Sequence, residues 1–190
     1  MVRTVTKQHG FTLVEIAIVL VVIGLLLGGV MKGQEIIKNA KIKNIENSIN
    51  GMIASVATYQ ERYHALPGDD PRADSRWSGA GKGDGDGKVE NGNGTDEGEY
   101  FWDHLRRAGI IPGSGDAPPT HAFGGAMTVN YECHGIYNSV FLRLANITGE
   151  IAEIIDQKLD DGIPNSGSLR GHGSQTAYDP SGLYTLCVVL

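Results

Sequence analysis

The 190-residue sequence predicts an α+β protein in which one long N-terminal helix packs on a small antiparallel β-sheet. Three observations predict this fold class. An apolar run covers residues 11–31, an amphipathic helical pattern continues from it to about residue 63, and β-prone runs follow residue 125. The predicted organisation is therefore a short N-terminal segment at residues 1–10, a long helix at 11–64 and a globular head at 65–190.

The apolar run at residues 11–31 predicts a transmembrane helix. Its only charged residue is Glu15, and its length is enough to span a bilayer. Secretory signals end at a site of small residues, which is missing after Met31, so we expect the segment to be retained. A carboxylate inside hydrocarbon costs on the order of 3 kcal/mol. Glu15 therefore requires a function or a partner.

Beyond the apolar run, the pattern is that of an amphipathic helix. Its apolar positions are spaced by three and four residues: Ile42, Ile45, Ile49, Met52, Val56, Tyr59 and Tyr63. The helix should end before Pro67, because the residue that precedes a proline disfavours helical backbone. The stripe is expected to pack on the head, with a coiled-coil dimer as the alternative.

The head is predicted to begin with a long irregular stretch at residues 66–98, rich in Gly, Asp and Asn. A short helix at residues 100–108 follows, with Asp96 and Glu99 as a capping box. A second helix is expected at residues 150–159. Strands are expected at residues 126–131, 137–144 and 183–190. The last strand then forms the C-terminus.

Composition limits the classes of function. Apolar residues make up 41% and charged residues 20% of the chain, which are values of a globular protein. The formal net charge is -6, from 16 basic and 22 acidic residues, whereas phosphate contacts need a clustered basic excess. Nucleic acid is therefore not expected as the main partner.

The two cysteines, Cys133 and Cys187, allow one disulfide. They would pair if this part of the chain lies outside the cytoplasm, and would be two buried free thiols otherwise. The location of the head decides between these alternatives.

The loop at residues 82–90 resembles the middle of an EF-hand calcium loop. Asp84 and Asp86 take the third and fifth places, and the Lys88 carbonyl takes the seventh. Lys82 and Asn93 replace the usual acidic residues of the first and twelfth places, so other carboxylates would have to complete the shell. The nearby candidates are Asp69, Asp70, Asp74, Asp96, Glu97 and Glu99. Calcium is one alternative, and a solvated loop without an ion is the other.

No motif predicts an enzyme. The six histidines form no zinc-binding spacing, no serine lies in Gly-x-Ser-x-Gly, and no phosphate-binding Gly-x-Gly-x-x-Gly is present. The acidic cluster of Asp156, Asp160 and Asp161 is interpreted as a helix end and turn, with a metal site as the alternative. We expect no required cofactor and no catalytic residue.

The stretch from Lys7 to Glu15 carries a family resemblance. A short basic segment that ends in Gly10, followed by Phe11 and then by Glu15 within the apolar run, resembles the class III signal of type IV prepilins and type II secretion pseudopilins. The resemblance implies that residues 1–10 are a leader, that a prepilin peptidase cuts between Gly10 and Phe11, and that Phe11 is N-methylated. It further implies that Glu15 faces the terminal ammonium of a neighbouring subunit and so sets the register of a filament.

Short motifs in the head are similar to those of a pilin-like subfamily. They are a Leu-Pro-Gly-Asp turn at 66–69, the Gly/Asp loop at 83–87, Ala-Gly-Ile at 108–110 and Asp-Asp-Gly at 160–162. In pseudopilins, such a loop is associated with calcium. These motifs support the class of protein and not a specific role.

The resemblance implies a structural subunit of a type IV pilus-like or type II secretion filament. The alternative is a minor tip subunit that binds a surface, DNA or a secreted substrate. The implied partners are a prepilin peptidase, further copies or related pilins, an inner-membrane assembly platform and lipid.

The implied location is the bacterial inner membrane, with a single span and the head outside the cytoplasm, and after assembly a periplasmic or cell-surface filament. Flanking charge favours the opposite orientation. Arg3 and Lys7 precede the span, whereas Lys32, Lys38, Lys41 and Lys43 follow it. We give the cleavage motif precedence over this count.

Overall fold

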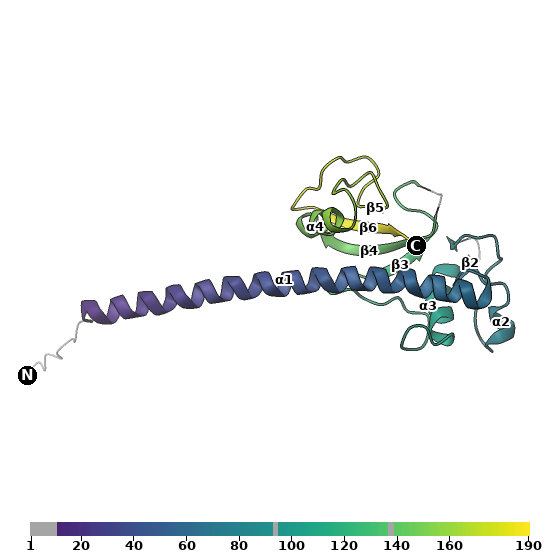
Figure 1. Cartoon of the computed structure of the whole chain (residues 1–190), viewed down its shortest axis with the longest axis horizontal. Coiled ribbons are helices and arrows are strands. Elements are labelled where there is room, and N and C mark those ends of the chain that lie inside the picture. Colours follow the sequence, from purple (N-terminus) through teal and green to yellow (C-terminus); the bar gives the residue numbers. More distant parts are fainter. Residues whose placement is uncertain (1–10, 93–94, 137–138) are drawn as a thin grey trace, which may run out of the picture. The chain divides into compact units, whose positions relative to one another are not determined.

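The computed structural model describes residues 11–92, 95–136 and 139–190. Contacts divide the chain into two compact units, Met1–Ala40 and Lys41–Leu190. The fold is α+β, as predicted, with a long N-terminal helix and a small antiparallel sheet of four strands (Figure 1). This composition of elements is consistent with a pilin-like fold.

Helix α1 spans Leu13–Tyr63 without a break and enters both units. Its buried residues begin at Ile42 and include Ile45, Ile49 and Tyr59, which confirms the predicted stripe as a packing surface of the second unit. The helix ends at Tyr63, directly before His64, whose φ is 54°. This left-handed conformation stops the helix before Pro67, close to the predicted end.

Three further helices are described in the second unit: α2 at Ala73–Arg76, α3 at Glu97–Arg107 and α4 at Gly149–Leu159. The predicted capping box of α3 is wrong, because Asp96 makes no side-chain capping bond. Asp96 instead pairs with Asn91 in a two-stranded ribbon, and the Asn91 amide oxygen accepts the Gly98 N–H at 3.0 Å. A residue from before the helix therefore supplies the missing acceptor.

The main sheet has the antiparallel order β3-β4-β6-β5. Its strands are β3 at Met127–Asn130, β4 at Phe141–Thr148, β5 at Leu169–Arg170 and β6 at Leu183–Val189, and the separate ribbon pairs β1 at Asn91–Gly92 with β2 at Thr95–Asp96.

The predicted strand at 137–144 is placed too early. It begins at residues 137–138, outside the described residues, while β4 continues to Thr148 past a register shift at Asn146, whose φ is 60°. A bulge of this kind interrupts the alternation from which the strand was predicted.

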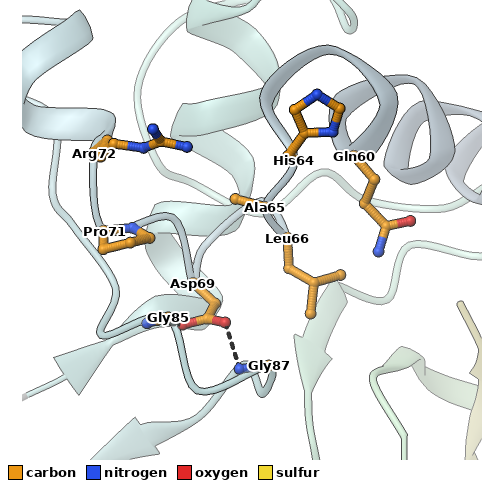
Figure 2. Close-up of a pocket in the computed structure, with 9 residues that line it drawn as sticks. All are labelled: Gln60, His64, Ala65, Leu66, Asp69, Pro71, Arg72, Gly85 and Gly87. Atoms are coloured by element: carbon orange, nitrogen blue, oxygen red, sulfur yellow. Dashed lines mark hydrogen bonds between the residues drawn. The ribbon is translucent and has the colours of Figure 1, made fainter.

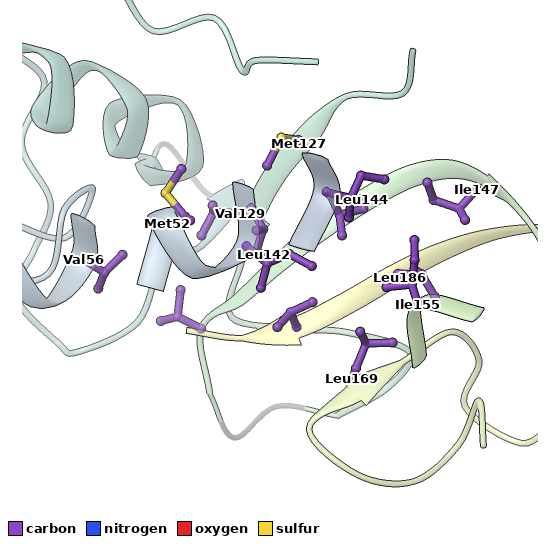
Figure 3. Close-up of a cluster of buried hydrophobic side chains, with 14 of the residues drawn as sticks. Met52, Val56, Met127, Val129, Leu142, Leu144, Ile147, Ile155, Leu169 and Leu186 are labelled. Carbon is purple, nitrogen blue, oxygen red and sulfur yellow. The ribbon is translucent and has the colours of Figure 1, made fainter. Parts of the chain in front are cut away.

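The core of the second unit lies between the sheet, α1, α3 and α4 (Figure 3). Leu142, Leu144 and Leu186 come from the central strands and are fully buried, as are Trp102 of α3 and Ile155 of α4. Strand β6 lies inside the sheet, so the C-terminal strand is a core element.

Candidate functional site

The described residues of the predicted processing and assembly site lie at the start of α1. Phe11 lies just before the helix and is 84% exposed, and Glu15 is in its first turn. Gly10 lies outside the described residues. The large apolar side chains that follow Phe11 are also exposed, and α1 is long and apolar enough to cross a membrane.

Glu15 is bound by Thr12 in a reciprocal capping arrangement. The Thr12 N–H and the Thr12 hydroxyl each donate to the Glu15 carboxylate at 2.8 Å, and the Glu15 N–H donates to Thr12 Oγ1 at 3.3 Å. The prediction of this site did not include Thr12. The Thr-x-x-Glu spacing of a capping box was the signal that could have found it.

Cys133 and Cys187 form a disulfide with a Cα–Cα distance of 6.3 Å. Both residues are at most 1% exposed and pack with Phe141. The bridge joins the turn after β3 to the internal strand β6, so the structure favours the paired alternative over two free thiols.

The Gly/Asp loop is held by two buried carboxylates. Asp69 accepts the N–H groups of Gly85 at 2.6 Å and Gly87 at 2.8 Å, while Glu97 accepts those of Asp84 at 3.2 Å and Glu90 at 3.0 Å. Burial is the main reason that the pKa values of Asp69 and Glu97 lie above their usual range. Sequence reasoning placed Asp69 and Glu97 among many candidates but could not find this role.

The structure brings Asp84 and Asp86 together with Asp69, with one carboxylate oxygen of each within 4.8 Å of the others. This donor set suits a hard cation such as calcium. Lys88 contacts the same cluster through its ammonium, 2.6 Å from Asp86 Oδ2. Asp70 lies elsewhere, because its carboxylate pairs with Arg76 and accepts the Tyr59 hydroxyl. Calcium binding itself stays a prediction.

A polar pocket of about 390 Å³ lies next to this loop, at the C-terminal end of α1 (Figure 2). Figure 2 shows the Asp69 carboxylate directed at Gly87. His64 and Arg72 line other parts of the same pocket. His64 and Arg72 are exposed, so polar groups of a partner could reach the pocket.

The acidic residues after α4 have structural partners. Asp156 accepts the Tyr178 hydroxyl at 2.7 Å, and Asp160 accepts the N–H of Leu169 at 2.9 Å. Asp161 accepts the Ser166 hydroxyl at 2.6 Å. The Asp161 bond, and the Gly162 N–H that donates to Asp156 at 3.2 Å, belong to the helix end and turn that the sequence predicted. One carboxylate oxygen of each of the three residues lies within 4.8 Å of the others, so the metal alternative is not tested.

Comparison with known proteins bears on the N-terminal segment. The family described as the prokaryotic N-terminal methylation motif matches residues 5–31. No curated protein and no solved structure matches the chain. The family match covers the segment in which Phe11 and Glu15 lie, and with the apolar start of α1 it fits a membrane-anchored precursor of the type IV pilin or pseudopilin type. The N-terminal segment of this chain is therefore a type IV pilin-like prepilin signal.

Proposed function

We propose that this chain is a structural subunit of a type IV pilus-like or type II secretion filament. The observation that carries the proposal is the methylation motif at residues 5–31, whose residues 13–31 form the exposed apolar start of a helix of 51 residues. The methylation motif is that of pilin-type families, whose members are structural subunits.

Processing is proposed to occur between Gly10 and Phe11, by a prepilin peptidase that also methylates the new amine of Phe11. This cut would remove the charged residues Arg3 and Lys7 and leave an apolar N-terminus. The new ammonium group would then lie at the edge of the membrane helix. A subunit that has not been cut lacks this group.

Assembly is proposed to use Glu15. In a filament core, an unpaired carboxylate would be very costly, and an ammonium group of a neighbouring subunit compensates it. In the single chain, the same carboxylate accepts two hydrogen bonds from Thr12. Exchange of the Thr12 bonds for a Phe11 ammonium of the next copy would therefore couple assembly to processing.

The head is proposed to lie outside the cytoplasm of a bacterial cell, with α1 in the inner membrane and in contact with lipid and an assembly platform. The buried disulfide supports this placement, because disulfides form and persist in oxidising compartments. After assembly, the subunit would lie in a periplasmic or cell-surface filament.

A second candidate is a minor subunit at the filament tip that binds a surface, DNA or a secreted substrate. The polar pocket beside Asp69, His64 and Arg72 favours it. Subunit stoichiometry separates the two candidates, because a major subunit fills the fibre and a tip subunit is present in few copies.

The test of processing is intact mass and N-terminal sequencing of the protein from native membranes. We expect a chain that starts at N-methylated Phe11. A chain that still starts at Met1, in cells with an active prepilin peptidase, contradicts the proposal.

The test of assembly compares Glu15→Gln with Glu35→Gln. The first substitution keeps the shape of the side chain but removes its charge, so we expect processing to continue and filaments to be lost. Glu35 is an exposed partner of Lys32 on the same helix, and its replacement should leave filaments intact. Equal filament yields from the two variants would overturn the role of Glu15.

A further inference from the structure

A groove of about 370 Å³ lies in the second unit between α1, α3 and the loop that follows α3. Gly51 and Ser55 of α1 line one part of it, Trp102 and Arg106 of α3 another, and Met127 belongs to β3. Most of this lining is apolar or small. The groove is separate from the polar pocket beside Asp69 and contains no residue of the processing or assembly site.

Two buried N–H donors among the residues that line the groove lack an acceptor in the part of the chain that the structure describes. Trp102 is 1% exposed, and its Nε1 donates to no group. Arg106 donates through its terminal nitrogens to the carbonyls of Gly115 at 2.7 Å and Ala117 at 2.8 Å, but its Nε has no acceptor. An unsatisfied buried donor costs about 1–3 kcal/mol. At the groove, the positive charge of the Arg106 guanidinium is contacted only by the Gly115 and Ala117 carbonyls among the described residues.

The helix face beside the groove is suited to contact with protein. Between Glu46 and Glu61, α1 carries no charged residue. The exposed positions of this stretch are mainly small or amide side chains: Asn47, Asn50, Gly51, Ala54, Ala57 and Thr58. Ile53 is also 40% exposed. Contact at such a face desolvates no ion and orders few long side chains.

The same chain carries a complementary projection. The Gly182 N–H donates to the Asp179 carbonyl at 2.9 Å, which closes a turn directly before Leu183. Leu183 is 69% exposed. The Asp179 carboxylate accepts from Ser181 and pairs with no cation among the described residues. Arg106 likewise pairs with no carboxylate of the described chain, so the two surfaces are complementary in charge.

We propose that the turn 179–183 of a second copy of this chain docks in the groove, with Leu183 against its apolar lining and the Asp179 carboxylate toward Arg106. The groove and the turn share no residue, so every copy carries both halves of the contact. A head-to-tail contact of this kind does not have to close into a dimer, and it can propagate from copy to copy. The inference rests on the proposed function and names the contact between heads in the filament.

The test places a photo-crosslinking amino acid at Ser55 in the full-length chain, in native membranes with the assembly machinery. We expect an adduct with residues 179–183 of a second copy, identified by mass spectrometry of the linked peptides. Leu183→Asn should reduce the adduct about tenfold, through the loss of apolar contact. Ile163→Asn is the matched control, because Ile163 is also an exposed head residue at 40%, and it should leave the adduct unchanged.

A second crosslinker at Ile16 of α1 separates this inference from the proposed function. One outcome is a crosslink between membrane helices at position 16 together with a Ser55 adduct to another segment or to a different protein. This outcome overturns the docking contact and leaves the filament role intact. Unprocessed chains without crosslinks between copies at either position overturn both. An adduct that survives Leu183→Asn also overturns the docking contact.

Discussion

Thr12 links the start of α1 to the carboxylate on which assembly is proposed to depend. Its hydroxyl is both a donor to and an acceptor from Glu15. We expect Thr12→Val to weaken the first helical turn by about 1 kcal/mol, because the side-chain cap is lost. Thr12→Ser keeps the hydroxyl and should behave like the natural chain. Amide hydrogen exchange of residues 13–16 in the full-length chain in micelles checks this, and equal protection in all three chains contradicts it.

His104 gives the head a dependence on pH. Its Nδ1 accepts the Gly68 N–H at 2.9 Å and its Nε2 lies 2.9 Å from the Gly81 carbonyl, so the ring is bound as the neutral tautomer with the proton on Nε2. Burial lowers the pKa of His104, against the opposing effects of the hydrogen bond to Gly81 and of Asp103, and with smaller lowering effects of Arg76 and Arg107. Because the folded pKa lies below the unfolded value, the contribution of His104 to stability is complete above that value and is lost as pH falls.

Urea unfolding of residues 41–190 measures this dependence, between about pH 7.5 and about pH 5. We expect the natural fragment to lose more free energy of unfolding across this range than His104→Gln. The buried carboxylates of Asp69, Glu97 and Asp156 have raised pKa values, so their contributions change in the opposite direction and are common to both proteins. Parallel pH profiles of the two proteins would contradict the role of His104.

Local spacing allowed some site residues to be predicted and left others out of reach. Phe11 and Glu15 lie within one short motif, so the sequence alone could predict them as a processing and assembly site. His104 binds Gly68, which is 36 positions away, and Asp69 binds Gly87, which is 18 positions away. Such partners meet only after the chain has folded, and no periodicity along the sequence marks them.

At the scale of elements, the backbone conformation of the Gly/Asp loop brings carboxylates together, and this leads to a prediction about calcium binding. Gly85 and Gly87 both have positive φ, at 81° and 85°, and their N–H groups face Asp69. The three carboxylates of Asp69, Asp84 and Asp86 lie close together, and their mutual repulsion would be relieved by a divalent cation.

We expect calcium to raise the melting temperature of residues 41–190, and a chelator to reverse the increase. The double variant Asp84→Asn, Asp86→Asn should lose most of the response, because it removes two of the three charges. Asp74→Asn is the control, since Asp74 is exposed and contacts Lys82 outside the cluster. A melting temperature of the natural fragment that does not respond to calcium would contradict the prediction.

The elements differ in how well local pattern predicted them. Helix α1 was predictable almost to the residue, because its stripe is regular and ends at a Leu-Pro-Gly turn. Strand β4 was not, because Asn146 interrupts its alternation and the strand recovers its pairing only at Ile147. The short strand β5 has two residues and pairs with β6 over a long separation, so it has no local signal.

At the scale of the whole molecule, the α+β class follows from the order of patterns along the chain. An amphipathic stripe and late β-prone runs can bury their apolar surfaces together only if that part of the helix covers the sheet. The apolar side chains of residues 11–31 take no part in this core, because they are exposed. The order of the strands in the sheet could not be predicted from the order of these patterns. It places the C-terminal β6 between β4 and β5, and this pairing depends on the course of the long connection between α4 and β6.

The disulfide constrains this course, since Cys133 and Cys187 are separated by 54 positions. A crosslink that closes a loop of this length restricts the unfolded chain and contributes about 4 kcal/mol. We therefore expect the double variant Cys133→Ser, Cys187→Ser of residues 41–190 to lose about that amount of free energy of unfolding. Reductant that has reached the bridge through the unfolded state should lower the free energy of unfolding of the natural fragment by a similar amount. Reductant should have no effect on the double variant, which controls for other actions of the reagent. Because both sulfurs are buried, the natural fragment should resist reduction while it is folded. A double variant as stable as the natural fragment would mean that the core alone fixes the position of β6, and that the bridge only follows from it.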